Sequence, residues 1–322
     1  MSSRIKLAEL VGWVERSDTH QPGDGYRYAQ PILRNHQHGF TLVEMIIVIV
    51  ITGIIGGIVA VFLKAPVQQY VDVARRADMT DIADTALRRI SRDLRLALPN
   101  SVRVTGTCNG TSTCFIEFLP TSGGGRYRAT PPGNELDFSS ASDGGFDVLG
   151  PPITATANDF LVIYNLGIPS VGGCAALGAD AYEGCNRRAI VTSGGAITFT
   201  PTALPFPFDS PGHRFHVIST PVSYVCIPVP GGVGGVLWRY WGYSIQDVQT
   251  KTDSIAELDA LALPATATKG KALLATNVSS CRFTYDASVV AQRSGLVTMH
   301  LAITQEGETV TLYNAAHVSN QP

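Results

Sequence analysis

The 322-residue chain is poor in charge. Asp, Glu, Lys and Arg together make up 16% of its residues, and the formal net charge at pH 7 is −2. Nucleic-acid-binding modules carry a basic patch or stripe, and this sequence has no such cluster. The composition therefore argues against a nucleic acid as a partner.

Signatures of catalysis are also missing. The chain has no G-x-S-x-G elbow, no phosphate-binding P-loop and no H-E-x-x-H pair. It has no C-x-x-C pair, and its cysteines are scattered, which disfavours a structural zinc site. We therefore expect a protein that is not an enzyme, with no catalytic residue, no cofactor and no metal.

The sequence contains two weaker patterns of potential metal ligands. His213 and His216 are three residues apart, and side chains alternate along a strand, so a strand would place them on opposite faces. Asp143 and Asp147 lie in a glycine-rich turn and have the oxygen ligands that Ca²⁺ prefers, but this ion takes 6–8 oxygens. Plain turn residues are the simpler interpretation, and Ca²⁺ binding stays open.

Charge is completely absent from Met45 to Leu63, where Thr52 is the only clearly polar side chain. Roughly 20 apolar residues suffice to cross a bilayer core. Glu44 lies at the start of this run, and a charge inside a membrane costs about 2.5–3.5 kcal/mol on insertion scales. We therefore expect Glu44 to have a function and to pair with a charged partner. A cleaved secretory signal fits poorly, because its apolar region spans only about 7–15 residues and no A-x-A site follows here. A plain uncleaved anchor remains the alternative.

The string Gly39-Phe40-Thr41-Leu42-Val43-Glu44 resembles the processing site of type IV prepilins and of type II secretion pseudopilins. The resemblance implies that prepilin peptidase cuts between Gly39 and Phe40 and methylates the new N-terminus. It also implies that Glu44 pairs with the terminal amine of a neighbouring subunit. Glycine suits the scissile position because it has no Cβ, so a protease can approach the backbone.

Residues 1–39 would then form the leader. Prepilin leaders are short and basic, whereas this one is long and its basic and acidic residues nearly balance. Only Arg34 lies close enough to the span to bias its orientation under the positive-inside rule. No Met occurs between Met1 and Met45, so one hypothesis is that translation starts at a non-Met codon near Leu33.

An N-terminal helix is expected over residues 40–98, transmembrane over 40–63 and amphipathic over 67–98. Pro66 should kink this helix, and Pro99 should close it. Favourable i,i+4 ion pairs are expected between Asp72 and Arg76 and between Asp84 and Arg88. The expected apolar stripe consists of Tyr70, Ala74, Ala77, Ala83, Leu87, Ile90, Leu94 and Leu98.

Three glycines interrupt the apolar run. Gly53, Gly56 and Gly57 either let packed helices approach closely or loosen the helix. Both interpretations remain open.

Residues 99–322 predict a β-rich domain. Runs of β-forming residues separated by turn signals give ten expected strands, at 113–119, 160–166, 189–192, 196–200, 215–219, 223–228, 235–243, 280–285, 295–304 and 308–315. Residues 305–307 should form a three-residue hairpin loop. Residues 121–132 and 151–158 are expected to be surface loops, and residues 256–271 a short helix followed by a turn.

One expected strand is rich in aromatic residues. Alternation would place Trp238 and Tyr240 on one face, and Arg239, Trp241 and Tyr243 on the other. A central strand covered on both sides is the favoured interpretation. A binding patch is the alternative, because Trp, Tyr and Arg are enriched in binding hot spots.

All six cysteines follow the apolar run. An even number in an exported domain indicates disulfides, although six cysteines allow 15 pairings. Proximity in the sequence favours Cys108–Cys114 and Cys174–Cys185, which leaves Cys226–Cys281.

Further segments, among them those at residues 70–72, 88–95, 98–103, 222–226 and 296–301, resemble MshO-type minor pilins of the mannose-sensitive haemagglutinin (MSHA) pilus. PilW and the pseudopilin GspJ are similar by pattern. The resemblance implies an α+β type IV pilin fold, a single-pass inner-membrane location with a periplasmic domain, and later incorporation into an extracellular pilus. The implied partners are prepilin peptidase, other minor and major pilins, and the inner-membrane assembly platform. The open alternatives are a PilW-like pilin, a secretion pseudopilin, a membrane-anchored enzyme and a tip adhesin.

Overall fold

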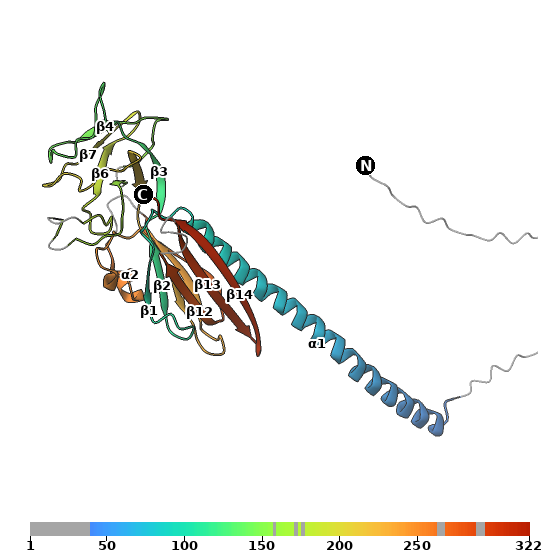
Figure 1. Cartoon of the computed structure of the whole chain (residues 1–322). Coiled ribbons are helices and arrows are strands. Elements are labelled where there is room, and N and C mark those ends of the chain that lie inside the picture. The colour runs from blue at the N-terminus through green and yellow to red at the C-terminus, as the bar shows by residue number, and fades with distance from the viewer. Residues whose placement is uncertain (1–38, 157–158, 171–172, 175–177, 263–267, 288–293) are drawn as a thin grey trace, which may run out of the picture. The chain divides into compact units, whose positions relative to one another are not determined.

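The computed structural model describes residues 39–156, 159–170, 173–174, 178–262, 268–287 and 294–322 (Figure 1). The expected leader thus lies outside the described residues, except for Gly39. The chain divides into two compact units, Met1–Phe62 and Leu63–Pro322. Helix α1 (Leu42–Leu94) begins in the first unit and ends in the second.

The second unit contains a short helix and fourteen described strands, grouped in three sheets. The strand order is β1-β2-β9-β10-β11 in the first sheet, β12-β13-β14 in the second and β3-β8-β5-β6-β7-β4 in the third, and every described strand pairing is antiparallel. The bounds are β1 Arg103–Gly106, β2 Cys114–Phe118, β3 Thr121–Arg126, β4 Gly145–Asp147, β5 Phe160–Ile163, β6 Arg187–Thr192, β7 Ala196–Phe199, β8 Arg214–Ile218, β9 Val222–Ile227, β10 Val236–Trp241, α2 Ile255–Ala260, β11 Gly270–Thr276, β12 Val278–Asp286, β13 Ser294–Gln305 and β14 Glu308–Ser319. A 3₁₀ turn, η1, covers Gln249–Lys251.

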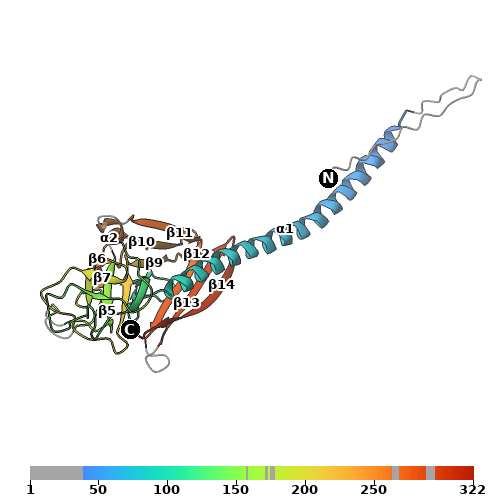
Figure 2. The ribbon, with the colours of Figure 1, turned by 90° about the horizontal axis from the view of Figure 1, so that it is seen from above.

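The C-terminal part of α1 lies beside β13 and β14 (Figure 2). Its apolar face packs into a core shared with the first two sheets, where Leu87 and Ile90 join Phe118, Tyr224 and Met299. The third sheet encloses a separate, aromatic-rich core. Helix α1 is therefore held by the first two sheets, and the third sheet has an interior of its own.

The expected apolar stripe is correct only in its C-terminal half. Tyr70, Ala74 and Ala77 are exposed, whereas Met79 and Ala86, which the stripe did not include, are buried. The helix continues through Pro66. Proline removes the amide donor of one intrahelical hydrogen bond, and its ring crowds the carbonyl four residues earlier, but neither effect ends α1 at this point.

The helix ends at Leu94, four residues earlier than expected. The Leu98 amide donates to the Leu119 carbonyl at 2.7 Å, and the Thr121 amide donates to the Leu96 carbonyl at 2.7 Å. These backbone groups pair with Leu119, which follows β2, and with Thr121, the first residue of β3. They are no longer available to a helix, so the tertiary structure ends α1 before Pro99 does.

One expected ion pair forms and the other does not. Arg88 Nε lies 2.6 Å from Asp84 Oδ2, as predicted. Asp72 instead pairs with Arg75 at 3.3 Å, and Arg76 reaches Glu308 on β14 at 2.9 Å. The prediction for Asp72 and Arg76 was wrong because a carboxylate from a distant strand is a closer partner for Arg76.

Each of the ten expected strands coincides with an observed strand, and β1, β3, β4 and β11 were missed. The segment Thr121–Arg126, predicted as a loop, is β3 and pairs with β8. Glycine has a low β-propensity, so the sequence pattern does not indicate a strand here. The close packing against β8 nevertheless requires glycine. A Cβ on Gly124 would lie 2.9 Å from the Phe215 carbonyl oxygen, and one on Gly125 would lie 3.1 Å from the Phe215 ring.

The hairpin between β13 and β14 is tighter than predicted. Gln305 pairs with Glu308, so the loop contains only Glu306 and Gly307, with φ values of 51° and 78°. Two central residues with positive φ are typical of a type I′ turn, whose twist matches that of the flanking strands.

Strand β10 lies between β9 and β11, which confirms the interpretation as a central strand. Trp238 and Tyr240 face a cluster with Leu258, whereas Trp241 packs against the core that holds α1. Tyr243 was expected on the face of Trp241 but joins Tyr240 instead. The reason is Gly242, whose φ of 80° ends the strand and breaks the alternation.

The short helix expected at the start of residues 256–271 is present. Helix α2 covers Ile255–Ala260, and its N-cap is Ser254, whose side chain accepts from the Glu257 amide. The C-terminal part of that range was expected to be a turn but belongs to β11, which begins at Gly270.

Candidate processing and assembly site

Gly39 and Phe40 immediately precede α1. The Phe40 side chain is 77% exposed, and a Cβ built on Gly39 would meet no atom within 4 Å. The peptide bond between them is thus open to approach, as a proteolytic site requires. Cleavage at this bond is a proposal.

Thr41 fixes where the helix begins. Its hydroxyl accepts a 3.2 Å hydrogen bond from the Glu44 amide, and its carbonyl accepts from the Met45 amide at 3.1 Å. A Thr followed three residues later by Glu is the capping-box spacing. The sequence prediction missed this role of Thr41, although the T-x-x-E pattern could have revealed it.

The Thr41 cap places Glu44 in the first helical turn. The N-terminus of a helix carries unsatisfied amides and partial positive charge, which favours a carboxylate there. Within the described residues no cation pairs with the Glu44 side chain.

The helix that follows Glu44 is long and apolar enough, by length and composition, to cross a membrane. From Met45 to Leu63 its apolar side chains are exposed. The hydroxyl of Thr52 donates to the Val48 carbonyl at 2.6 Å, so this one polar side chain is satisfied inside the helix. These features indicate a single-pass membrane anchor.

Gly53 and Gly57 are four residues apart and lie on the same face of the helix. A Cβ on either residue, or on Gly56, would meet nothing within 4 Å. The spacing is that of a G-x-x-x-G pair, which lets two transmembrane helices approach closely. The helix-packing role of these glycines stays a proposal, as does that of Pro66 farther along α1.

Three disulfides link Cys108 to Cys114, Cys174 to Cys185, and Cys226 to Cys281. The first two are the pairs that proximity favoured, and the third is the pair that they left. The third joins β9 of the first sheet to β12 of the second, and both of its half-cystines are fully buried. It therefore connects the two sheets that hold α1.

Sequence reasoning missed two polar clusters, of which the first lies at the C-terminal end of α1. In the first, the Asp93 carboxylate accepts from the Tyr224 hydroxyl at 2.7 Å and from Arg239 Nε at 2.8 Å. Burial raises the pKa of the Tyr224 hydroxyl, and its hydrogen bond to Asp93 acts in the same direction. The Tyr224 hydroxyl thus remains a protonated donor to the helix.

In the second cluster, Glu117 on β2 is 1% exposed. It accepts from Arg103 at 3.0 Å, from the Tyr243 hydroxyl at 3.1 Å and from the Thr252 hydroxyl at 2.8 Å. A buried charge persists only when it is paired and hydrogen-bonded, and Glu117 meets both conditions. The residues are far apart in sequence, so no local pattern signals this cluster.

The two weaker metal patterns gain no support. His213 precedes β8 and lies 3.6 Å from Asp209, while His216 lies within β8. The Asp147 carboxylate accepts from Arg128 Nε and the Asn134 amide. Over the described ranges, no group of three or more His, Cys, Asp or Glu side chains is arranged to hold a metal ion.

Residues 34–60 match a family described as "Prokaryotic N-terminal methylation motif". The matched segment contains Gly39, Phe40, Glu44 and most of the apolar run, and it leaves the β-rich part uncovered. No curated protein and no solved structure matches the chain.

Proposed function

We propose that this chain is the precursor of a minor pilin, cut by prepilin peptidase after Gly39 and methylated on Phe40. The observation that carries the proposal is the methylation motif, which ends in an apolar helix of membrane-spanning length. The motif supports a type IV pilin-like or pseudopilin-like precursor. It favours a structural protein over an enzyme.

Cleavage would create the group that Glu44 needs. Cutting the peptide bond after Gly39 leaves a free amine on Phe40, and N-methylation keeps that amine basic. In a membrane or in the fibre core, this cation and the Glu44 carboxylate of a neighbouring subunit would neutralise each other. Two opposite charges in contact cost far less in a low-dielectric medium than either charge alone.

Within this class, the segments similar to MshO-type pilins favour assembly or priming of an MSHA-type pilus, together with other minor and major pilins and the inner-membrane platform. Because Glu44 is present, the subunit would stack on another one inside the tip complex. A PilW-like pilin and a type II secretion pseudopilin are the near alternatives. Adjacent genes for a major pilin and a retraction motor would support the pilus, and genes for a secretin would support secretion.

N-terminal mass spectrometry of the membrane and pilus fractions tests the proposal. The expected N-terminus is N-methylated Phe40. Gly39→Val should block cleavage because a branched side chain obstructs the scissile bond. The matched control is Gly195→Val, at an exposed site where an added Cβ meets no atom within 4 Å. An intact leader on wild-type protein in both fractions would instead support a plain membrane anchor.

A further inference from the structure

Arg188 on β6 is a buried cation without a carboxylate partner. It is 4% exposed and takes part in none of the ion pairs between described residues. Burial lowers the pKa of its guanidinium, and no nearby acid raises it. Arginine nevertheless stays protonated in proteins, so the third sheet contains an uncompensated positive charge.

The guanidinium is held rigidly. Its Nη1 donates to the carbonyls of Cys185 at 3.0 Å and Arg187 at 2.9 Å, and its Nη2 donates to the Leu204 carbonyl at 2.9 Å. The group also lies 4.3 Å from the centre of the Phe206 ring. A guanidinium has five N–H donors, so three hydrogen bonds leave two donors for another acceptor.

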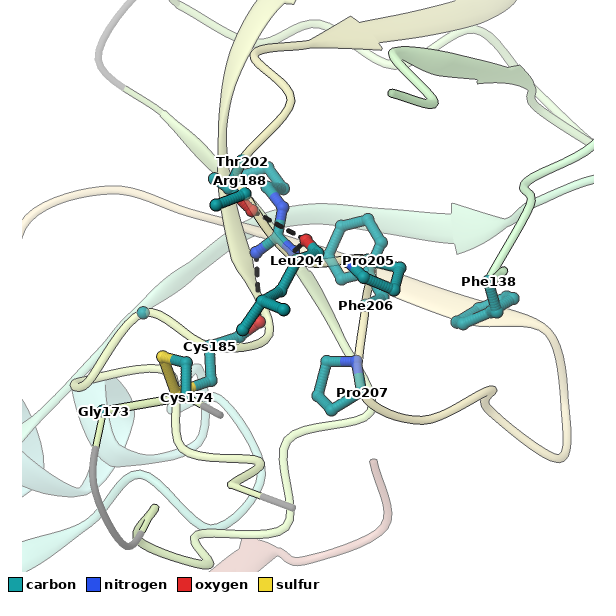
Figure 3. Close-up of a pocket in the computed structure, with 12 residues that line it drawn as sticks. Phe138, Gly173, Cys174, Cys185, Arg188, Thr202, Leu204, Pro205, Phe206 and Pro207 are labelled. Atoms are coloured by element: carbon teal, nitrogen blue, oxygen red, sulfur yellow. Dashed lines mark hydrogen bonds between the residues drawn. A yellow bond between two sulfur atoms is a disulfide. The ribbon is translucent and has the colours of Figure 1, made fainter. Parts of the chain in front are cut away.

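Arg188 forms part of the wall of a cavity of about 520 Å³. Small-molecule sites in proteins typically measure 300–1,000 Å³, with apolar walls and few polar groups. In the view of Figure 3, the Cys174–Cys185 disulfide and Phe138 lie on opposite sides of Arg188. The lining is mainly apolar and includes Phe138, Ala203, Leu204, Pro205, Phe206 and Pro207.

The two acids that share a cavity wall with Arg188 accept hydrogen bonds from other residues. Asp137 and Asp143 line a small adjoining cavity together with Arg188. The Asp143 carboxylate accepts from the Asp137 amide at 2.7 Å and from the Gly145 amide at 3.2 Å. Asp137 accepts from the amide and hydroxyl of Ser139. Among the described residues neither acid forms an ion pair with Arg188, so an anion from outside would supply the direct partner that the guanidinium lacks.

We infer that this cavity, the Arg188 pocket, binds a small ring-bearing carboxylate. The carboxylate would accept from the two free donors of Arg188, because a planar guanidinium suits a planar carboxylate. The ring would lie against the phenylalanine and proline side chains, which offer flat apolar surfaces. This site is distinct from the N-terminal processing site, and its function does not depend on whether the chain assembles into a fibre.

A purely structural role for Arg188 makes a different prediction. Its contact with the Leu204 carbonyl ties β6 to the loop at residue 204, and its contacts with the Cys185 and Arg187 carbonyls are local. Such a tie needs no ligand. In that case an acid would bind no better than its neutral analogue, and filling the cavity would change nothing.

The test is binding of benzoate and D-glucuronate to the full chain in detergent micelles, with benzamide and D-glucose as neutral analogues. Benzoate carries an apolar ring and glucuronate a sugar ring, so the pair distinguishes the two sources of carboxylate. At least one acid should bind roughly tenfold or more tightly than its analogue, equivalent to about 1.4 kcal/mol. Ala203→Trp, which fills the cavity from an exposed position, and Arg188→Gln should each weaken binding by a similar factor.

The matched control is Ala256→Trp, the same change at an exposed alanine of α2 outside the cavity, which should leave binding unchanged. If Arg188→Gln fails to fold, Ala203→Trp alone decides, since it keeps the guanidinium. Equal binding of acid and analogue, binding that survives Ala203→Trp, or no binding of either acid up to about 10 mM would each overturn the inference.

Discussion

Asp93 and Arg239 form a 2.8 Å ion pair that joins the last turn of α1 to the central strand β10. Both side chains are 15% exposed, and the Tyr224 hydroxyl on β9 donates to the same carboxylate oxygen of Asp93. The pair thus fixes the helix to two strands that lie more than a hundred residues away in sequence. It also forms at the end of the helix that carries the membrane anchor.

Asp93→Ala should lower the free energy of unfolding by about 2–3 kcal/mol, because it leaves the largely buried Arg239 without its carboxylate. Chemical denaturation of the detergent-solubilised protein measures this change. Asp84→Ala is the matched control, since it removes an exposed helical ion pair of the kind that contributes little. Equal losses in both variants would contradict the role assigned to Asp93.

The Arg103–Glu117 pair predicts a non-additive double substitution. Arg103→Met alone should cost about 3–5 kcal/mol, because it leaves a nearly inaccessible carboxylate unpaired. Adding Glu117→Leu should recover part of that loss, since two apolar side chains replace the ion pair. Urea unfolding of the two single variants and of the double variant completes the cycle. Additive losses would show that the two residues do not depend on each other.

The disulfides should differ in their effect on stability. Cys226–Cys281 spans 55 residues and Cys108–Cys114 spans 6. Chain-entropy arguments assign about 4 kcal/mol to a loop of the larger size and about 2 kcal/mol to the smaller. Replacing both cysteines of a pair by alanine should therefore lower the melting temperature more for the long-range pair. The reverse order in calorimetry would mean that loop entropy does not govern these bonds.

His216 should make stability depend on pH. Burial lowers the pKa of its imidazole from the ordinary value of 6.5, and the nearby Arg214 acts in the same direction. Below about pH 6.5 the unfolded chain therefore binds more protons than the folded one, so this contribution to stability falls as the pH drops. It is fully present above pH 6.5.

We expect His216→Gln to flatten the unfolding free energy between about pH 7 and pH 5, where one such group contributes at most about 1.4 kcal/mol per pH unit. His317→Gln, at an exposed site on β14, is the control and should keep the wild-type slope. An unchanged slope in His216→Gln would assign the dependence to other groups.

Glu44→Gln should leave processing intact and impair assembly. Glutamine keeps the size of the side chain but cannot neutralise the methylated amine of a neighbour, so incorporation into pili should fall roughly tenfold or more. Immunoblots of sheared pili and membranes report the two pools. Asp78→Asn, an exposed position on the same helix, removes one charge elsewhere and should assemble normally. Normal incorporation of Glu44→Gln would refute the pairing mechanism.

The parts of the fold that were predictable are those encoded by neighbouring residues. The apolar run predicted the helix, and alternating β-forming residues predicted ten strands. Short spacings favoured two of the three disulfides and left the third pair. The predictions failed where a distant segment competed with a local pattern. Arg76 pairs with Glu308 instead of Asp72, and backbone pairing at Leu96 and Leu98 ends α1 early.

Taken by itself, the sequence determined the processing string around Gly39, the charge at Glu44 and the span that follows, because motif, charge and length are local properties. Only the tertiary structure decided that Asp93 would reach Arg239, that Glu117 would be buried among its donors and that Arg188 would face a cavity without an acid. These features depend on which strands become neighbours. A charged side chain has a large effect on stability only when it is buried. Burial arises only when segments far apart in sequence exclude water together.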